Sequence, residues 1–490
     1  MDTPQSQNSQ NIFQVEEVGS GEPQNQQVSQ GSELSPNFPT TPSEPGFDDT
    51  PGGNPLFRIL IILLVIVLVA VVIYFGYRFF SSRGSGSNGP VSLTYWGLWE
   101  DEAIMQPIID EYQNQNPNVT ISYIFQTPKQ YRERLEAAIQ RGGEVDIFRY
   151  HNTWVPMLKD KLAPLPESVM AKKEYEATFY PVTKTDLNVS GNYVGIPLMI
   201  DGLGLFANTD ILKASGVADP KTWDDVQIAS DTLKVIPPDG KIRTGGIALG
   251  TAGNVEHFSD IMGLMMMQNG ANLSNPTSPE ATDALAYYRL YAEEPSRVWD
   301  ETMPNSILAF AQGQVAMIFA PSWEALAIKA INPDLNFKVI PVPQLKDAPP
   351  VTWASYWVEG VANNSPNQKA AWEFLKYLSS KEVMTQLYTN EANIRGFGEP
   401  YSRTDLAQSL TSDPIVGAYI IQAPQARSFP LASKTHDNGL NDRMIKYLED
   451  GINSVAQGAS PQSAMQTVAQ GFQQVLGQYG LAAAAASPTP

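Results

Sequence analysis

The chain of 490 residues contains no cysteine, which excludes disulfide bonds, thiolate nucleophiles and cysteine-based zinc sites. It has three histidines (His151, His257 and His436), and because they are far apart in the sequence we expect no histidine-rich metal centre. Basic residues are also few: 32 Lys and Arg stand against 51 Asp and Glu, giving a formal net charge of −19. A nucleic-acid partner would require clustered Lys and Arg to neutralise phosphates, so the composition argues against one.

The first 55 residues contain no Lys or Arg, and most of them are Gln, Asn, Ser, Pro and Gly. A segment of this composition buries too little apolar surface to offset the loss of chain entropy on folding. We therefore predict a disordered acidic and polar arm over 1–55.

Residues 59–77 form a long apolar run without charge, between Arg58 and Arg78. A helix of that length spans roughly 28 Å, which is close to the hydrocarbon thickness of a bilayer. We predict a transmembrane helix within 56–80 that contacts lipid over 59–77, followed by a flexible linker over 81–90. A cleaved signal peptide fits less well, because the apolar run is too long and no small-residue cleavage site follows it.

The globular part begins at Val91 with an alternation of strand and helix patterns. Strands are predicted at Val91–Trp96, Val119–Phe125 and Val145–Phe148, and helical spacing separates them. This order predicts right-handed crossovers and a largely parallel sheet. In such a doubly wound α/β lobe, ligands bind beyond the carboxyl ends of the strands.

Two loops that follow the first and third predicted strands combine aromatic and hydrogen-bonding side chains. They contain Trp99 and Glu100, and Tyr150 and Asn152, respectively. Aromatic rings pack against the C–H faces of sugars, while sugar hydroxyls need polar partners in a partly apolar cleft. A single tryptophan is more often a packing residue, but two such clusters at strand ends favour a ligand site.

The stretch Gly191–Val226 reads as two strands, a short helix that stops at Gly216 and a further helix capped by Thr222. Asp201 is the one acid in the apolar run Ile196–Phe206. A carboxylate there is costly unless it is bound or faces a cleft. The alternative is that Asp201 is a solvated turn residue.

The stretch Gly191–Val226 resembles the family 1 extracellular solute-binding proteins, the maltose-binding-protein-like receptors of ABC sugar importers. Two further stretches share this resemblance, Phe310–Trp323 (FAQGQVAMIFAPSW) and Asn363–Leu378. The resemblance covers roughly residues 91–478. It implies an α/β, two-lobed periplasmic-binding-protein-like fold of type II over 91–480, with lobe crossings near 197–202 and 342–360.

The resemblance also implies site residues. In that family the acid that matches Asp201 hydrogen-bonds the sugar, and the tryptophan that matches Trp323 stacks on it. A loop that holds Glu256 and His257 reaches the cleft, and a polar ligand contact often lies where Arg395 stands. For His257, a helix-capping or solvated role is an equal alternative.

The run Trp353–Val361 (WASYWVEGV) is expected to return between the lobes. Trp353 and Tyr356 would add aromatic surface to the cleft, and alternation would send Trp357 to the face opposite Tyr356. Where maltose binders have an Asp-Arg pair, this chain has Thr153-Trp154, so the resemblance leaves the sugar open. The lipid-modified cysteine that anchors many relatives is replaced by the predicted spanning helix.

The expected function is that of a receptor that captures a sugar or oligosaccharide between hinged lobes and delivers it to the transmembrane subunits of an ABC permease. We expect a monomer with no catalytic residues, cofactor or metal, and a disordered tail over 481–490. The charges around the predicted span do not fix its orientation, so the resemblance alone places the N-terminus in the cytoplasm and the binding domain outside. The alternatives are a membrane-bound sensor or adhesion protein, and a glycoside hydrolase using Asp201 with Glu256 or Glu100.

Overall fold

The computed structural model describes residues 89–481, which belong to a compact unit spanning Ser87–Pro490. The predicted acidic arm over 1–55, the transmembrane helix within 56–80, nearly all of the linker and the tail beyond 481 lie outside the described residues. Within 89–481, none of the helices combines the length and the apolar character that a bilayer span requires.

The first lobe is built on a four-stranded sheet in the order β11-β3-β1-β2. The central strand β1 (Val91–Gly97) pairs in parallel with β2 (Val119–Phe125) and β3 (Ile147–His151). The fourth strand, β11 (Trp357–Val361), returns from much later in the chain and pairs antiparallel with β3. The predicted parallel order of the first three strands is therefore confirmed, and β11 adds an antiparallel edge.

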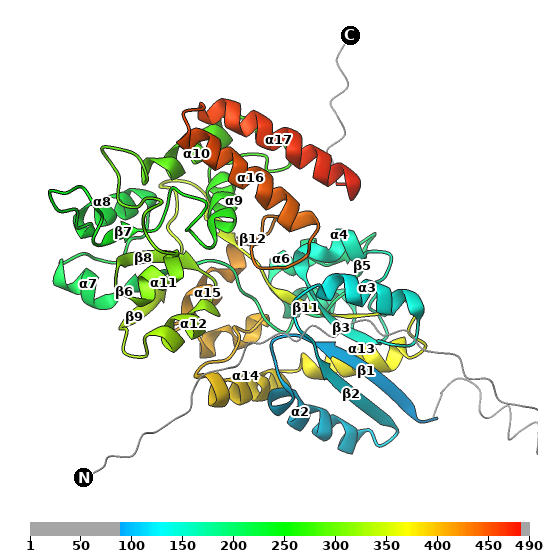
Figure 1. The fold of residues 1–490 in the computed structure, drawn as a ribbon. Helices are drawn as coiled ribbons and strands as arrows, with labels where there is room; N and C mark the ends of the chain where they lie inside the picture. The colour runs from blue at the N-terminus through cyan, green and yellow to red at the C-terminus, as the bar shows by residue number, and fades with distance from the viewer. Residues whose placement is uncertain (1–88, 482–490) are drawn as a thin grey trace, which may run out of the picture. The chain divides into compact units, whose positions relative to one another are not determined.

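Helices cover both faces of this sheet (Figure 1). The main ones are α2 (Glu102–Gln115), α3 (Tyr131–Arg141), α13 (Gln368–Leu378) and α14 (Lys381–Arg395), and shorter ones are α4 (Val155–Leu158), α5 (Lys172–Thr178) and α6 (Pro181–Asp186). Leu93 and Tyr95 of β1 pack in one core cluster with α2 and α13. On the other face, Trp96 packs against Tyr131 of α3. The alternating pattern of β1 thus divides the lobe into two cores.

The second lobe is built on another four-stranded sheet, in the order β7-β8-β6-β9. Its strands are β6 (Gly204–Asn208), β7 (Gly245–Ile247), β8 (Val315–Ala320) and β9 (Phe337–Ile340). Strand β8 pairs in parallel with β7 and antiparallel with β6, and β6 pairs antiparallel with β9. Every residue of β6 and β8 is buried, which explains why both read as continuous apolar runs.

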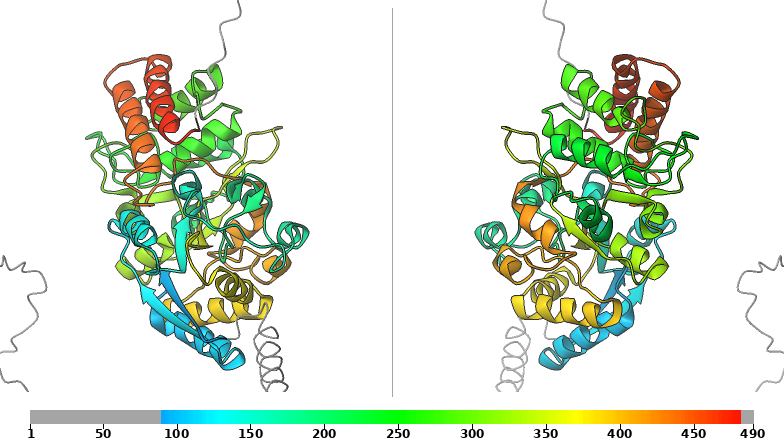
Figure 2. Two further views of the ribbon diagram at one scale, coloured as in Figure 1. Left: turned by 90° about the vertical axis from the view of Figure 1, so that its right-hand side faces the viewer. Right: turned by 90° about the vertical axis from the view of Figure 1, so that its left-hand side faces the viewer.

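Helices pack around this second sheet. They are α7 (Thr209–Ala214), α8 (Trp223–Leu233), α9 (Phe258–Gln268), α10 (Pro279–Leu290), α11 (Ser306–Ala311), α12 (Glu324–Ile331), α15 (Gly417–Gln422), α16 (Leu440–Ala456) and α17 (Pro461–Gln478). The last two lie side by side and pack against α10, as Figure 2 shows in orange, red and green.

The local signals in the stretch Gly191–Val226 are confirmed. The Asn208 side chain accepts hydrogen bonds at the start of α7, and Gly216 after this helix has φ +66°. Thr222 and Asp225 form a reciprocal capping box at the start of α8. Each of these features depends on residues within four positions, which is why the sequence alone identifies them.

The chain passes between the lobes in three segments: 197–203, 341–356 and 396–416. Isolated bridges tie these segments together, from Met199 to Tyr401 and from Gly202 to Ala354. A Cβ on Gly202 would lie 1.8 Å from the carbonyl oxygen of Trp353, so this approach of two backbones requires glycine. The sequence predicts crossings near 197–202 and 342–360 but not the one over 396–416, because this segment contains no long helix or strand.

Candidate functional site

A cavity of about 510 Å³ lies between the two lobes at the crossings. The first lobe and the crossings contribute Trp99, His151, Met199, Asp201, Ser355, Trp357, Arg395 and Glu399. The second lobe contributes Glu256, Pro321, Trp323, Glu324, Leu326, Ala327, Ser433, Lys434 and His436. The volume is within the range of small-molecule sites in proteins.

Three tryptophans form the aromatic part of the lining. The ring of Trp99 lies 5.5 Å from that of Trp357 in an edge-to-face arrangement on the first-lobe side. Trp323 lies on the second-lobe side, with its ring 5.6 Å from the His257 ring. Trp99 and Trp323 remain exposed, and Trp99 has φ +75°, a strained backbone conformation for a bulky residue. Two large rings thus border the same cavity from opposite lobes.

Asp201 lies on the first crossing and is only 3% exposed, so the alternative of a solvated turn residue is wrong. Its Oδ2 accepts a hydrogen bond of 2.7 Å from the Ser322 hydroxyl, and its Oδ1 accepts one of 2.7 Å from the Gly202 N–H. Burial raises the pKa of Asp201 to about 7, although these hydrogen bonds act in the opposite direction. Asp201 borders the cavity, and its contact with a ligand stays a prediction.

His257 is buried behind the cavity and does not line it. Its Nδ1 lies 2.7 Å from the Ser433 hydroxyl and its Nε2 lies 3.0 Å from Oε1 of Glu324. Both ring nitrogens are therefore engaged, so the solvated alternative is wrong. His257 lies at the N-cap position of α9, but its side chain makes no capping hydrogen bond there. The imidazole instead supports the ring of Trp323 from behind.

Glu100 is also buried behind the cavity, in an ion-pair network of the first lobe. The buried Arg149 contacts Oε2 of Glu100 and donates from Nε to Oε1 of Glu359 at 2.6 Å. Burial raises the pKa of Glu100 well above its usual range, although the Arg149 charge opposes this shift. This placement removes Glu100 as the partner of Asp201 in the hydrolase alternative.

Six of the eleven expected ligand residues do not line the cavity: Glu100, Tyr150, Asn152, His257, Trp353 and Tyr356. Asn152 and Tyr356 both donate hydrogen bonds to the partly buried Asp186, at 2.8 and 2.9 Å. Trp353 donates from Nε1 to Asp260 at 2.8 Å inside the second lobe.

Tyr150 is buried because β3 continues three residues beyond its predicted end at Phe148. In the longer strand Tyr150 points into the core, where its hydroxyl donates to the carbonyl of Val194. Alternation then directs the next residue, His151, towards the cavity.

The structure brings the other five expected residues to one cavity: Trp99, Asp201, Glu256, Trp323 and Arg395. Trp357 also lines the cavity, although it was not among the expected ligand residues. Strand alternation predicted that Trp357 lies on the face opposite Tyr356, so the sequence pattern could have identified it. Glu399 and the loop 433–439 had no such signal, because neither belongs to a periodic element.

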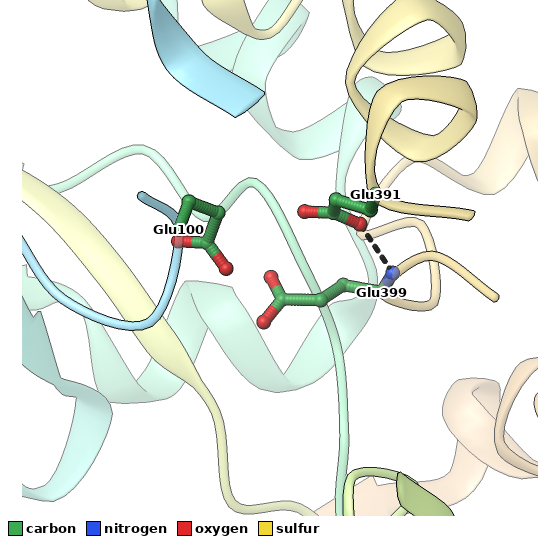
Figure 3. Close-up of side chains that lie close together, drawn as sticks. All are labelled: Glu100, Glu391 and Glu399. Carbon is green, nitrogen blue, oxygen red and sulfur yellow. Dashed lines mark hydrogen bonds between the residues drawn. The ribbon is translucent and has the colours of Figure 1, made fainter. Parts of the chain in front are cut away.

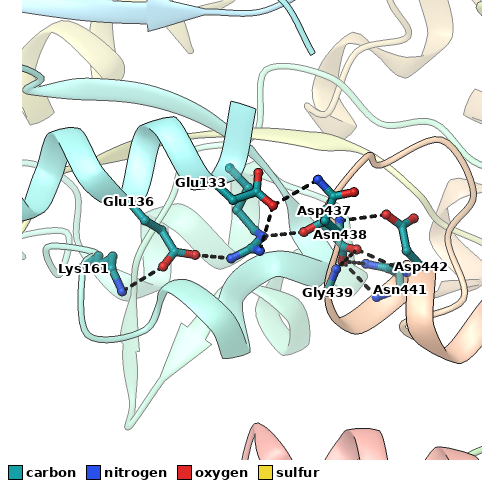
Figure 4. A network of polar contacts seen from close by, with 9 residues as sticks. Glu133, Glu136, Lys161, Asp437, Asn438, Gly439, Asn441 and Asp442 are labelled. Atoms are coloured by element: carbon teal, nitrogen blue, oxygen red, sulfur yellow. Dashed lines mark hydrogen bonds and ion pairs between the residues drawn. The ribbon is translucent and has the colours of Figure 1, made fainter. Parts of the chain in front are cut away.

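The loop 433–439 joins the lobes at one side of the cavity. It precedes α16 of the second lobe, yet the carbonyl of Asp437 accepts a hydrogen bond of 2.6 Å from Nε of Arg132 on α3. Asn438 donates to Glu133 of the same helix at 3.0 Å, as Figure 4 shows. Lys434 and His436, which line the cavity, have φ of +59° and +53°. This loop therefore borders the cavity with Lys434 and His436 and contacts the opposite lobe with the residues that follow them.

Three carboxylates at the first-lobe side, Glu100, Glu391 and Glu399, converge closely enough to hold a metal ion (Figure 3). Of the three, only Glu399 lines the cavity.

Comparisons with known proteins give one consistent result. A profile of the family described as bacterial extracellular solute-binding protein matches residues 97–385. A putative binding protein of Brucella abortus (strain 2308) is 19% identical over 373 residues, which is 73% of this chain and 87% of that protein.

Solved structures share the fold. The sugar-binding protein MalE from Xanthomonas citri aligns with a TM-score of 0.66 at 20% identity, over 79% of this chain and 98% of that one. A solute-binding protein from Thermotoga lettingae bound with α-D-tagatose aligns with a TM-score of 0.60 at 22% identity, over 79% of this chain and 100% of that one. At these identities the likeness establishes the two-lobed α/β architecture.

Proposed function

Because the chain belongs to the family of bacterial extracellular solute-binding proteins, we propose that it is the substrate-binding receptor of an ABC transporter and captures a sugar or oligosaccharide. The observation that carries the proposal is the cavity between the lobes, which has Trp99 and Trp357 on one side and Trp323 on the other. Rings on two sides offer apolar plates for the C–H faces of a pyranose.

The polar groups of the cavity suit the hydroxyls of such a ligand. Ser355, Glu256 and Glu399 border the cavity beside the aromatic rings, and Arg395 and Lys434 add donors. The structurally similar sugar-binding protein MalE and the tagatose-bound protein from Thermotoga lettingae support the same ligand class.

Delivery to a permease is the further part of the proposal. Residues 59–77 would anchor the receptor in the membrane, with the N-terminus in the cytoplasm and the binding domain outside. A short linker after the anchor would keep the domain at a high effective concentration beside its transporter. Fractionation should find the full-length chain in membranes, and protease added outside intact cells should cut the large domain.

The test of ligand binding is a sugar panel read by thermal shift and tryptophan fluorescence. A sugar that binds raises the unfolding temperature by mass action, and Trp323→Ala should weaken its affinity at least about tenfold through loss of the stacking surface. The matched control is Ile331→Ala, which truncates an exposed apolar side chain on the adjoining helix α12 outside the cavity. Equal affinities of Trp323→Ala and the unchanged protein for an identified sugar would overturn the assignment.

A further inference from the structure

Three glutamates from distant parts of the chain meet at the first-lobe side of the cavity. Glu100 follows β1, Glu391 lies on α14 and Glu399 lies on the third crossing. One carboxylate oxygen of each lies within 4.8 Å of the others, and Figure 3 shows the three carboxyl groups turned towards a common point. Glu100 and Glu391 are buried, and Glu399 borders the cavity.

The arginines nearby do not match these carboxylates in number. Arg149 is directed to Glu100 and Glu359. Arg395 is the other one, and its Nη2 lies 3.2 Å from Glu391 and 3.8 Å from both Glu100 and Glu399. Within residues 89–481, four carboxyl groups therefore share two guanidinium groups, which leaves two negative charges without a counter-charge from that range if all four are ionised.

The hydrogen bonds of the cluster are incomplete within the described part of the chain. Oε1 of Glu100 and Oε1 of Glu391 are enclosed and accept no hydrogen bond from residues 89–481. Nε of Arg395 is enclosed too and donates none within that range. Buried carboxylate oxygens are costly unless a donor or a cation satisfies them, so this arrangement points to a ligand with positive charge.

We propose that Glu100, Glu391 and Glu399 form a binding site for a divalent cation of the calcium type, in the wall of the cavity. Calcium binds carboxylate oxygens at about 2.4 Å, so ligand oxygens up to about 4.8 Å apart can share one ion. Magnesium, with bonds of about 2.1 Å and strict octahedral geometry, fits such separations less well. All three ligands are oxygens, which disfavours metals that prefer imidazole or thiolate.

Arg395 is the group that a cation would displace. Its side chain is 19% exposed and borders the cavity, and cation binding would require it to turn away from the carboxylates into that space. Two of its three contacts, at 3.8 Å, are longer than hydrogen bonds. The cation site does not require that the cavity bind a sugar, so each assignment can fail without the other.

The experiment titrates the full-length protein, purified in mild detergent and freed of metal with chelator, with terbium and then calcium. Salt at about 0.15 M screens weak surface binding. We expect saturable terbium luminescence sensitised by Trp99, the residue next to Glu100, its loss on addition of calcium, and a higher unfolding temperature in calcium.

Glu391→Gln and Glu399→Gln should each weaken terbium and calcium binding at least about tenfold, because each removes a charged ligand. Glu399→Gln is the variant that keeps the test valid if the buried Glu391→Gln does not fold. The matched control Glu382→Gln neutralises an exposed acid on the same helix α14 and should bind as the unchanged protein does. Unsaturable terbium binding, or equal calcium affinity in Glu399→Gln and Glu382→Gln, would overturn the proposal.

Discussion

On the side of the cavity that faces the second lobe, Asp201 accepts hydrogen bonds from Ser322 and Gly202, and Glu324 pairs with His257. On the first-lobe wall, Glu100 and Glu391 each have one carboxylate oxygen that accepts no hydrogen bond from residues 89–481, and both lie beside Glu399 and Arg395. Both sides bury acids, but Asp201 is satisfied by an uncharged hydroxyl and an N–H group, whereas Glu100 and Glu391 lie among charges of both signs.

The difference matters because the two kinds of burial respond to different changes. An acid held by neutral donors can stay protonated or ionise with a modest change in its surroundings. An acid held by a buried guanidinium depends on that one charge, and removing the partner leaves a charge without compensation. Substitutions should therefore affect stability most on the first-lobe wall, whereas Asp201 is the single acid through which a pH dependence can be isolated, because its partners do not carry charge.

The largest effect is expected from Arg149→Met. This change leaves Glu100 and Glu359 buried without their partner, and breaking such a pair costs about 3–5 kcal/mol of the free energy of unfolding. Urea unfolding followed by tryptophan fluorescence measures it.

The control for this change is Arg141→Met, which removes an arginine with a 60% exposed side chain that pairs with Glu144. Exposed pairs contribute at most about 1 kcal/mol. Similar losses in the free energy of unfolding for the two variants would show that the buried ion pairs contribute no more to stability than an exposed one.

A pH-dependent effect of intermediate size is expected from Asp201→Asn. The pKa of Asp201 is raised to about 7, so the folded state keeps a proton that the unfolded state releases near its usual pKa. That contribution to stability is present at low pH and lost as pH rises through about 7, with a slope of up to about 1.4 kcal/mol per pH unit.

Because an asparagine side chain cannot ionise, the unfolding temperature of the Asp201→Asn variant relative to the unchanged protein should rise from pH 5 to 7 and then level off. The control is Asp225→Asn, at an exposed capping residue whose pKa is lowered by the Lys221 and Thr222 N–H groups, so its difference should stay flat over this range. A flat difference for Asp201→Asn as well would mean that its hydrogen bonds keep the carboxylate ionised.

The smallest effect is expected from Lys434→Met. The Lys434 side chain is 43% exposed and pairs with Glu256 at the second-lobe rim. Water screens such a pair, so its removal should change the free energy of unfolding by less than about 1 kcal/mol. Urea unfolding measures this change. A loss of the free energy of unfolding above about 2 kcal/mol would show that the Lys434–Glu256 pair contributes more than an exposed pair does.

Much of the fold could be predicted from the sequence because its signals are local. The caps at Asn208 and Thr222, the left-handed Gly216 and the strand at Val119–Phe125 depend on near neighbours or on simple alternation. The third crossing has no such pattern, so nothing in its residues indicates that it passes between the lobes.

The site was predicted only in part, for a physical reason. Trp99 and Trp323 are exposed rings next to strand ends, where a pattern can identify them. The burial of Glu100 instead depends on Arg149 and Glu391, which come from other elements and meet it only after folding. The place of Tyr150 depended on where β3 ends, and an error of three residues moved it from the cleft to the core.

The hydrogen bonds of Asp437 and Asn438 to helix α3 also bear on how fast the cavity can open. Any separation of the lobes on that side has to break these bonds and to move Lys434 and His436 at the same time. Stronger bonding between the loop 433–439 and α3 would therefore slow both the entry and the release of a ligand. Across a series of loop variants, a longer residence time of the ligand would go with a slower uptake rate.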